Sequence, residues 1–268
     1  MTNPPFFSFV MAVKNGLEYL PAAIDSILEQ SFTDWELVLI DDGSDPQTST
    51  YMQTLSRDPR IRLVTQANIG LTLSLNKGIA LARGEYIVRH DGDDISHPER
   101  LAKLFRVIQQ THADFIFGRA VSFGRGAEQV VPHAALVYGF HSSILRFGNL
   151  FVHGTLCCRR QLLGTNPYNP SHRYAQDFDL FIRLIYSAAV GVYMLEPLYR
   201  LRESTQSISV KRAGEQLSCT RTIVREHFGT DSWLVVGEVG ARRRALQLIR
   251  RVLCLVHSAL PNRRLLLA

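Results

Sequence analysis

The sequence has few cysteines and no long apolar run. Its 268 residues include four cysteines; none forms a CxxC pair, and Cys157 and Cys158 are adjacent, which disfavours a bridge between them. This pattern excludes a disulfide scaffold and predicts a reduced, cytoplasmic protein. No apolar run approaches the roughly 18 to 20 residues that a membrane-spanning helix needs. The first residues lack a basic region and a cleavage site, so we expect no signal peptide.

Acidic side chains are outnumbered by basic ones. The chain carries 30 Lys and Arg against 24 Asp and Glu, a formal net charge of +6, and residues 239–268 contain seven arginines and no acid. A basic balance favours a partner with phosphates, such as a nucleic acid, an anionic lipid or a nucleotide. Hydrophobic residues make up 46% of the chain, an ordinary value for a globular protein with a sizeable core.

Strand and helix signals alternate along the first hundred residues. Apolar runs at residues 6–13, 35–40, 61–64 and 85–90 are separated by helical patterns, which predicts a mostly parallel sheet flanked by helices. Polar clusters follow three of the runs: Lys14-Asn15, Asp41-Asp42 and Asp91 to Asp94. Ligands bind beyond the carboxyl ends of parallel strands, so we expect these three loops to meet at one binding edge.

The segment "RHDGDDISHPERL" places three aspartates within four positions, directly after a strand. Such a cluster is suited to a hard divalent cation, which carboxylates and substrate phosphates hold together. An EF-hand is excluded, because loop positions 6 and 12 hold Ser96 and Ala102. The alternative is a solvated loop whose acids favour the positive end of the following helix, with Ser96 as its N-cap.

Two other polar segments have ordinary structural explanations. "DDGS", from Asp41 to Ser44, is a common turn sequence. "NIGLTLSLNKG" places Asn68 in a loop before a predicted helix that contains Asn76 and Lys77, for which helix capping is the favoured role. Neither segment indicates a function alone.

Five segments, taken in order, resemble the nucleotide-diphospho-sugar transferases of glycosyltransferase family 2. They are "VMAVKNGLEYLPAAIDSILEQSFTDWELVLIDDGS", "NIGLTLSLNKGIALARGEYIVRHDGDD", "PERL", "HGTLCCRR" and "YAQDFDLFIRL". The resemblance covers roughly residues 6–205 and implies the GT-A fold, a Rossmann-like α/β fold with a mostly parallel central sheet. It also implies a domain at 1–210, with a nucleotide-sugar-binding half (1–115) and an acceptor-side half (116–210), followed by a basic, amphipathic helical extension (211–268).

The resemblance implies a nucleotide-sugar site in the first half of the domain. The backbone of Ala12 and Val13 and the side chain of Asp42 would contact the base. Asn15 and Asn68 would line the same site. A UDP-sugar is the expected donor.

The resemblance also implies the metal, base and acceptor positions. Asp91 and Asp93 stand at the DxD positions of the donor site, and Asp93 or its neighbour Asp94 would ligate Mn²⁺ or Mg²⁺. Asp177 occupies the general-base position at the start of a predicted helix, where the helix dipole favours its ionised form. His153 lies in the acceptor-side loop.

Two positions depart from the family pattern. Lys14 stands where the family usually has a tyrosine that stacks on the base, which weakens the assignment of the nucleotide. Gln176 precedes Asp177 where the family usually has a glutamate. The aspartate is retained, so the sequence still supports catalysis.

The function implied is an inverting, metal-dependent glycosyltransferase that acts on a glycan or lipid-linked acceptor in surface polysaccharide or lipopolysaccharide assembly. Alternatives are a non-catalytic sugar-nucleotide-binding protein and a metal-dependent nucleotidyltransferase. A dinucleotide-dependent oxidoreductase is disfavoured, because no GxGxxG follows the first strand.

The C-terminal residues 239–268 have apolar residues at helical spacing and arginines roughly opposite them. This pattern predicts either a solvated helix face or a peripheral contact with the inner face of the cell membrane. No aromatic residues are interleaved with the arginines, so we expect no nucleic-acid partner.

Overall fold

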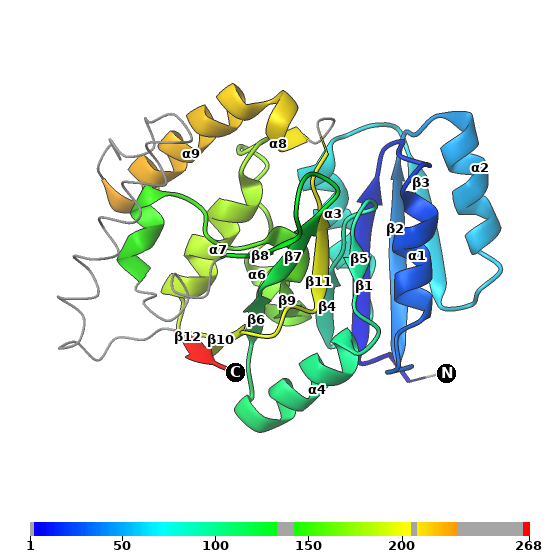
Figure 1. The fold of residues 1–268 in the computed structure, drawn as a ribbon, viewed down its shortest axis with the longest axis horizontal. Coiled ribbons are helices and arrows are strands. Elements are labelled where there is room, and N and C mark those ends of the chain that lie inside the picture. Colours follow the sequence, from blue (N-terminus) through cyan, green and yellow to red (C-terminus); the bar gives the residue numbers. More distant parts are fainter. Residues whose placement is uncertain (1–2, 133–141, 205–207, 230–264) are drawn as a thin grey trace.

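The computed structural model describes residues 3–132, 142–204, 208–229 and 265–268. Within these residues a large sheet is formed by β1 (Phe7–Val13), β2 (Trp35–Asp42), β3 (Ile61–Gln66), β4 (Tyr86–Arg89), β6 (Phe115–Gly118), β9 (Cys157–Arg159), β10 (Gly191–Met194) and β12 (Leu265–Leu267). Their order is β12-β10-β6-β9-β4-β1-β2-β3 (Figure 1). The strand β9 is antiparallel to β4 and β6, and the other pairs are parallel. The predicted mostly parallel sheet is confirmed.

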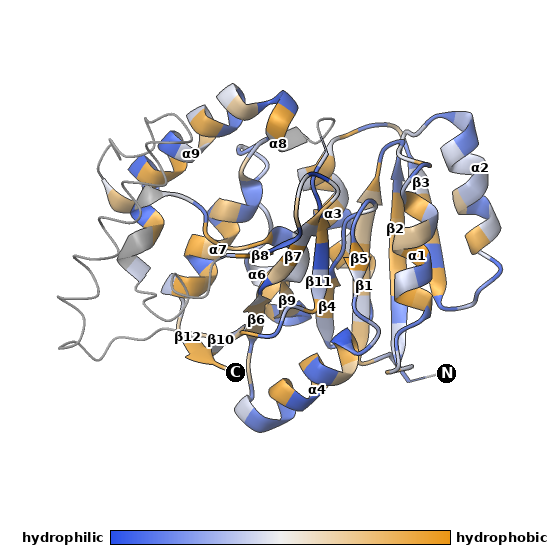
Figure 2. Ribbon diagram, viewed as in Figure 1, coloured by the Kyte–Doolittle hydropathy of each residue, from blue (hydrophilic) through white to orange (hydrophobic). Residues whose placement is uncertain are grey.

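Helices cover both faces of this sheet. One face packs against α1 (Leu20–Leu28), α2 (Pro46–Leu55) and α4 (Arg100–Thr111). The other packs against α3 (Leu71–Leu81), α6 (Arg160–Thr165), α7 (Gln176–Tyr186) and α9 (Ala213–Phe228). Figure 2 shows hydrophobic and hydrophilic residues along α4, α7 and α9, as expected for helices with one face on a core.

A second, smaller sheet lies beside the acidic loop. It consists of β5 (Ile95–Ser96), β7 (Ala120–Phe123), β8 (Gln129–Val131) and β11 (Tyr199–Arg202), in the order β5-β11-β7-β8. Two 3₁₀ helices, η1 (Ser142–Phe147) and η2 (His153–Thr155), and the short α8 (Ile208–Lys211) complete the described elements.

The predicted N-cap role of Ser96 is wrong. Ser96 lies in β5, its backbone N–H donates to the Ser26 hydroxyl at 3.0 Å, and α4 begins four residues later at Arg100. The hydroxyl of Ser96 instead accepts a 3.1 Å hydrogen bond from the Arg100 guanidinium. The strand pairing with β11 takes this residue out of the helix start.

The strand register brings three polar loops to one edge. In the parallel pairings, Val13 of β1 lies opposite Asp41 of β2, and Val10 lies opposite Arg89 of β4. The loops that follow these three strands therefore leave the sheet side by side, so their predicted meeting at one edge is confirmed. Ligand binding at this edge stays a prediction.

The C-terminal region is helical only in part. The predicted helix at residues 213–228 is confirmed as α9. Residues 265–267 form β12, parallel to β10, so the prediction of helix up to the last residues is wrong there. Residues 230–264, which hold most of the basic segment, lie outside the described residues. None of the described helices combines the length and apolar character needed to cross a bilayer.

The cysteine pair in β9 fills the core. Cys157 and Cys158 are fully buried and free, and they point to opposite faces of the sheet, one into each core cluster. This alternation is the normal side-chain pattern of a strand.

Candidate functional site

The loops after β1 and β2 are joined by hydrogen bonds. The backbone N–H of Asn15 donates to the Ser44 hydroxyl at 2.9 Å, and the Asn15 side-chain oxygen accepts from the backbone N–H of Asp45 at 2.8 Å. Asn15 has a φ of 64°, a conformation that asparagine tolerates better than most residues. The predicted nucleotide-sugar residues Ala12, Val13 and Asn15 thus border one loop pair.

Asp42 holds the loop after β3. Its buried carboxylate accepts four hydrogen bonds of 2.8 to 2.9 Å, from the side chains of Gln66 and Asn68 and the backbone N–H groups of Ile69 and Gly70. Burial alone would raise the pKa of Asp42, but these donors outweigh it and lower the pKa. A carboxylate accepts about four hydrogen bonds. The predicted contact of Asp42 with a base would therefore replace one of these donors.

Asp91 is paired with a buried arginine. Arg89, the last residue of β4, is 2% exposed, and its guanidinium bonds to the Asp91 carboxylate. The backbone N–H of Asp91 donates to the Tyr199 hydroxyl at 3.0 Å. Burial opposes ionisation of Asp91, but the guanidinium charge dominates the balance and its pKa is lowered. Asp91 is thus an ionised side chain that Arg89 and Tyr199 hold in place.

The two neighbouring aspartates differ from Asp91 and from each other. Burial, and then the charge of Asp91, raise the pKa of Asp93 to about 6 and that of Asp94 well above its ordinary value. Asp94 is 1% exposed and accepts a 2.7 Å hydrogen bond from the backbone N–H of Arg202. Asp93 is only partly buried, and its backbone oxygen accepts from the Arg202 guanidinium at 2.8 Å. Asp93 therefore has the more accessible carboxylate.

A glycine allows η2 and β11 to pack closely. A Cβ atom on Gly154 of η2 would lie 2.3 Å from the Tyr199 ring, so only glycine fits there. Arg100 joins the two sides, because its guanidinium donates to the Gly154 oxygen at 2.7 Å and lies 4.8 Å from the Tyr199 ring centroid. The "HGT" segment is thereby fixed against the strand that supports Asp91.

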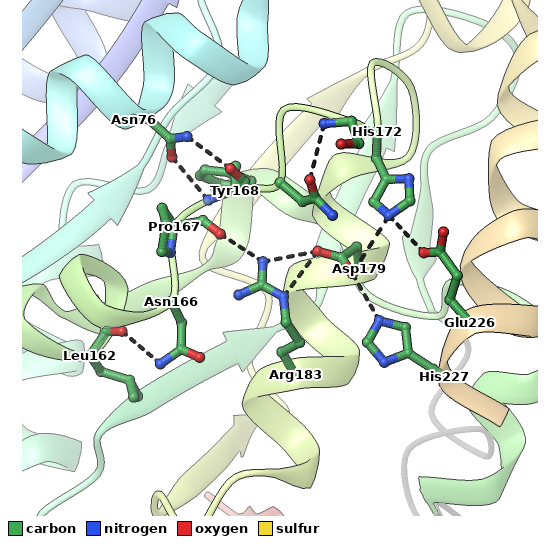
Figure 3. A network of polar contacts seen from close by, with 12 residues as sticks. Asn76, Leu162, Asn166, Pro167, Tyr168, His172, Asp179, Arg183, Glu226 and His227 are labelled. Atoms are coloured by element: carbon green, nitrogen blue, oxygen red, sulfur yellow. Dashed lines mark hydrogen bonds and ion pairs between the residues drawn. The ribbon is translucent and has the colours of Figure 1, made fainter.

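His153 is partly buried beside Tyr168. Its Nε2 atom lies 2.7 Å from the Tyr168 hydroxyl. Burial, and then the charge of Arg89, lower the pKa of His153 to about 3, so the ring is neutral at neutral pH. The Asn76 amide holds the backbone of Tyr168 through two hydrogen bonds of 2.8 and 2.9 Å (Figure 3). Asn76 is thus a clamp between α3 and this loop, and the predicted capping role is wrong.

Asp177 lies in the first turn of α7. The helix begins at Gln176 after Ala175, whose φ of 59° turns the chain sharply. Burial raises the pKa of Asp177 to about 6, against the backbone N–H groups of the first turn, which lower it. The charges of Asp91 and Arg89 act on it with smaller, opposed effects. As expected, the N–H groups at the helix start favour the ionised form of Asp177, but burial disfavours it more strongly.

A second polar network anchors the same helix. Buried Asp179 accepts from Arg183, four residues on in α7, and from His227 of α9 at 2.8 Å. Arg183 also donates to the Pro167 oxygen at 2.7 Å, and His172 lies 3.1 Å from Glu226 of α9. Figure 3 shows these side chains converging from α7, α9 and the loop before α7. This network fixes α7, and therefore Asp177, between α9 and the Tyr168 loop.

The acidic loop fits a cation that takes much of its shell from a substrate. Among the described residues, no three His, Cys, Asp or Glu side chains group so as to hold a metal by themselves. The charge of Asp91 raises the cost of ionising Asp93, which a divalent cation would relieve. Mg²⁺ and Mn²⁺ sites built from one or two carboxylates and substrate phosphates match this donor set.

The structure groups most of the predicted residues and adds others. Charge interactions link Asp91 to both His153 and Asp177, although 86 positions separate the two aspartates. Sequence reasoning missed Arg89 and Tyr168, which lie among these residues. The only signal for Arg89 was a charged residue within an apolar strand, and nothing local marked Tyr168.

Comparisons with known proteins agree on one family. The model of the family described as "Glycosyl transferase family 2" matches residues 8–162. The glycosyltransferase EpsE of Bacillus subtilis (strain 168) is 31% identical over 218 residues, which cover 77% of this chain and 76% of EpsE. The O-antigen biosynthesis glycosyltransferase WbnJ of Escherichia coli is 28% identical, covering 66% of this chain and 71% of its own.

Solved structures share the fold. S. aureus TarS in complex with UDP-GlcNAc has a TM-score of 0.68 and 17% identity, covering 91% of this chain and 72% of that chain. The mannosyltransferase PcManGT of Pyrobaculum calidifontis, in complex with GDP-Man and Mn²⁺, has a TM-score of 0.62 and 17% identity, covering 96% and 82%. These likenesses establish a mostly parallel α/β GT-A fold.

Proposed function

This chain belongs to glycosyl transferase family 2, and from that premise we propose that it moves a sugar, with inversion, from a nucleoside-diphosphate sugar to a hydroxyl acceptor. The observation that carries the proposal is the grouping of Asp177, Asp91 and His153 around buried Arg89. Such a transfer requires a general base close to a loop that binds the sugar nucleotide, and Asp177 and the acidic loop at Asp91 to Asp94 would fill these two roles.

The loops after β1, β2 and β4 would bind the donor. Ala12, Val13, Asn15 and Asn68 border the sheet edge at which a base and ribose would lie. Asp91 and Asp93 would face the diphosphate. The solved relatives bind UDP-GlcNAc and GDP-Man, and a UDP-sugar is our proposed donor here.

Asp93 is the residue we assign to a divalent cation, Mn²⁺ or Mg²⁺. Its carboxylate is accessible, whereas Asp94 is buried against the backbone of β11. When bound, the cation would act as a Lewis acid that stabilises the charge of the departing diphosphate. Arg89 and Tyr199 would keep Asp91 ionised and oriented beside it.

Asp177 would act as the general base. The acceptor hydroxyl loses its proton to the carboxylate as its oxygen attacks the anomeric carbon from the face opposite the diphosphate. One carboxylate base suffices for a direct displacement, whereas a glycosidase needs two flanking acids. His153, neutral and bonded to Tyr168, would line the acceptor side. Names such as that of WbnJ suggest a surface glycan or a lipid-linked sugar as the acceptor.

The test is a screen of UDP-, GDP- and dTDP-sugars for stabilisation of the protein against heat, with Mn²⁺ or with EDTA. A ligand at 100 times its Kd should add about 2.7 kcal/mol of stability. We expect one nucleotide class to stabilise the unmutated chain only with the metal, and Asp93→Asn to abolish that dependence.

Two results would contradict the proposal in different ways. Equal stabilisation in Mn²⁺ and EDTA would remove the metal from donor binding. Stabilisation without turnover of the donor, across a panel of glycan and lipid-linked acceptors, would favour a binding protein over a transferase. A new sugar nucleotide among the products would indicate a nucleotidyltransferase.

A further inference from the structure

The segment between η1 and η2 places one amide directly against the proposed base. Asn149 donates a hydrogen bond from Nδ2 to Oδ2 of Asp177, with 2.8 Å between the two atoms. Asn149 is exposed and Asp177 is partly buried, so the contact lies at the rim of the site. The two residues are 28 positions apart, and neither helix capping nor strand pairing requires them to meet.

The orientation of this amide is set by a second hydrogen bond. Its oxygen, Oδ1, accepts from the backbone N–H of Phe151 at 2.9 Å. An amide side chain has one accepting and one donating end. Because Phe151 engages the accepting end, the NH₂ group is directed at Asp177.

The remaining groups around Asp177 do not supply this contact. Of the described residues, the charged and titratable groups that act on it are Arg89, Asp91 and Tyr168. Arg89 directs its guanidinium to Asp91 and the His90 oxygen, and the Tyr168 hydroxyl is engaged with His153. Asn149 is thus the described side chain that donates to the Asp177 carboxylate.

We infer that Asn149 is a positioning residue for Asp177: it holds one carboxylate oxygen and leaves the other to receive the acceptor proton. The inference rests on the proposed function. A donor to the ionised form favours that form, so Asn149 offsets part of the burial that opposes ionisation of Asp177. Restriction of the carboxylate to one rotamer also keeps its free oxygen aligned with the acceptor.

Two substitutions remove the hydrogen bond from Asn149 to Asp177 while keeping the turn that Asn149 forms with Phe151. Asn149→Ser and Asn149→Asp keep an oxygen that accepts from the Phe151 N–H, but neither has an NH₂ group to reach Asp177. Asn169→Ser is the matched control. The Asn169 side chain accepts from the backbone N–H two residues later, that of Ser171, at 3.0 Å, in a turn of the same kind as that at Asn149. Loss of the turn alone should affect the two positions alike.

The first measurement is the carboxyl-carbon NMR titration of Asp177, assigned with Asp177→Asn, which needs no substrate. We expect the titration midpoint to rise by about half to one pH unit in Asn149→Ser, and further in Asn149→Asp, where a second carboxylate repels the first. Asn169→Ser should leave the midpoint unchanged. Midpoints within about 0.2 pH unit of the unmutated value in both Asn149 variants would overturn the inference, since a donor to the ionised form must lower this midpoint.

The second measurement is transfer at saturating donor. We expect Asn149→Ser to lower kcat by about tenfold, with the donor KM unchanged and the acid limb moved to higher pH. An unchanged kcat and pH profile, in a chain that transfers sugar before mutation, would also overturn the inference. Absence of transfer by the unmutated chain would instead contradict the proposed function, and the inference with it.

Discussion

At the scale of single residues, Asp177 combines two opposing influences. Burial raises its pKa to about 6, and the N–H groups of the first turn of α7 favour the charged form. A base with a pKa close to the working pH takes a proton readily and is still largely ionised beforehand. An exposed aspartate, with a pKa of about 4, would be the weaker base.

We expect Asp177→Asn to lower the transfer rate by about 10² to 10⁴, the range for loss of a positioned general base. Asparagine is nearly isosteric, so donor affinity should hold. Ala175, and not Asp177, occupies the N-cap position of α7. The melting temperature should therefore stay the same or rise, because a partly buried charge is removed. Transfer rates, donor titrations and melting curves measure the three effects.

Asp25→Asn provides the control, since Asp25 is an exposed acid on α1, on the opposite face of the sheet. A loss of stability in Asp177→Asn, with normal turnover per folded molecule, would assign Asp177 a structural role. Transfer within about threefold of the unmutated rate would also remove it as the base, since this lies far short of the expected range.

The same pKa predicts an acid limb in the pH profile. The ionised form is the base, so kcat should fall as the pH drops through about 6, by about tenfold for each further pH unit. Asp93 also titrates near 6 and would affect donor binding. Measurement of kcat at saturating donor and metal isolates the step that depends on Asp177. A flat kcat between pH 5 and pH 8 would contradict the prediction.

Residue positions at the site were predictable where a sequence motif marked them, and not where long-range packing set them. "DGDD" marked Asp91 and Asp93 because acids after a strand are unusual, and the structure places them at the sheet edge. Asn149 carried no such signal, since its partner is 28 positions away. The sequence also contained no sign of the four hydrogen-bond donors to Asp42, because two of them are backbone N–H groups of another loop.

At the scale of elements, α7 depends on a charge network centred on Asp179 in its first turn. Asp179 is buried, whereas Arg183 and His227 each keep 25% of their side-chain surface exposed. Removal of one member of a buried ion pair leaves the others without compensation. The contacts of α7 with α9 should therefore depend on this one carboxylate.

We expect Asp179→Asn to lower the free energy of unfolding by about 3 kcal/mol, the lower end of the range for a broken buried pair, because water still reaches two partners. Urea or thermal unfolding measures the change. Glu215→Gln is the control, as it removes the exposed pair with Arg212 on α9 and should have no measurable effect. Equal stability of Asp179→Asn and the unmutated chain would show that the network does not hold α7.

Elements were predicted well where their periodicity was long. The runs that became β1, β2 and α3 are seven to eleven residues long and were recognised. The second sheet was missed, because β5, β7, β8 and β11 have two to four residues each, and β11 joins β5 and β7 from far along the chain. The same long-range pairing took Ser96 into a strand, against its local capping pattern.

At the scale of the whole molecule, the basic segment must be tested without cutting the chain. Residues 265–267 pair with β10, so truncation before them would remove an edge strand along with the arginines. Substitution of glutamine for Arg242, Arg243, Arg244, Arg250 and Arg251 leaves that strand intact.

If the segment contacts membranes, the substituted chain should bind anionic vesicles much more weakly than the unmutated chain, since each arginine near the surface contributes about 1 kcal/mol. Binding of the unmutated chain should also weaken as salt is added. Co-sedimentation with vesicles that contain anionic lipid, and with neutral vesicles as the control, measures both effects. Equal pelleting of the two chains would exclude an electrostatic attachment.

The antiparallel strand β9 has a consequence for the order in which parts of the protein fold. The strands β3, β2, β1 and β4 form one contiguous block of the sheet and come from residues 7–89. The strand β6 reaches this block only through β9, which lies some seventy positions after β4. Pairings between distant segments form more slowly than local ones. During synthesis, therefore, we expect β1 to β4 to assemble first, and the half that carries Asp177 to dock onto them after β9 has been made.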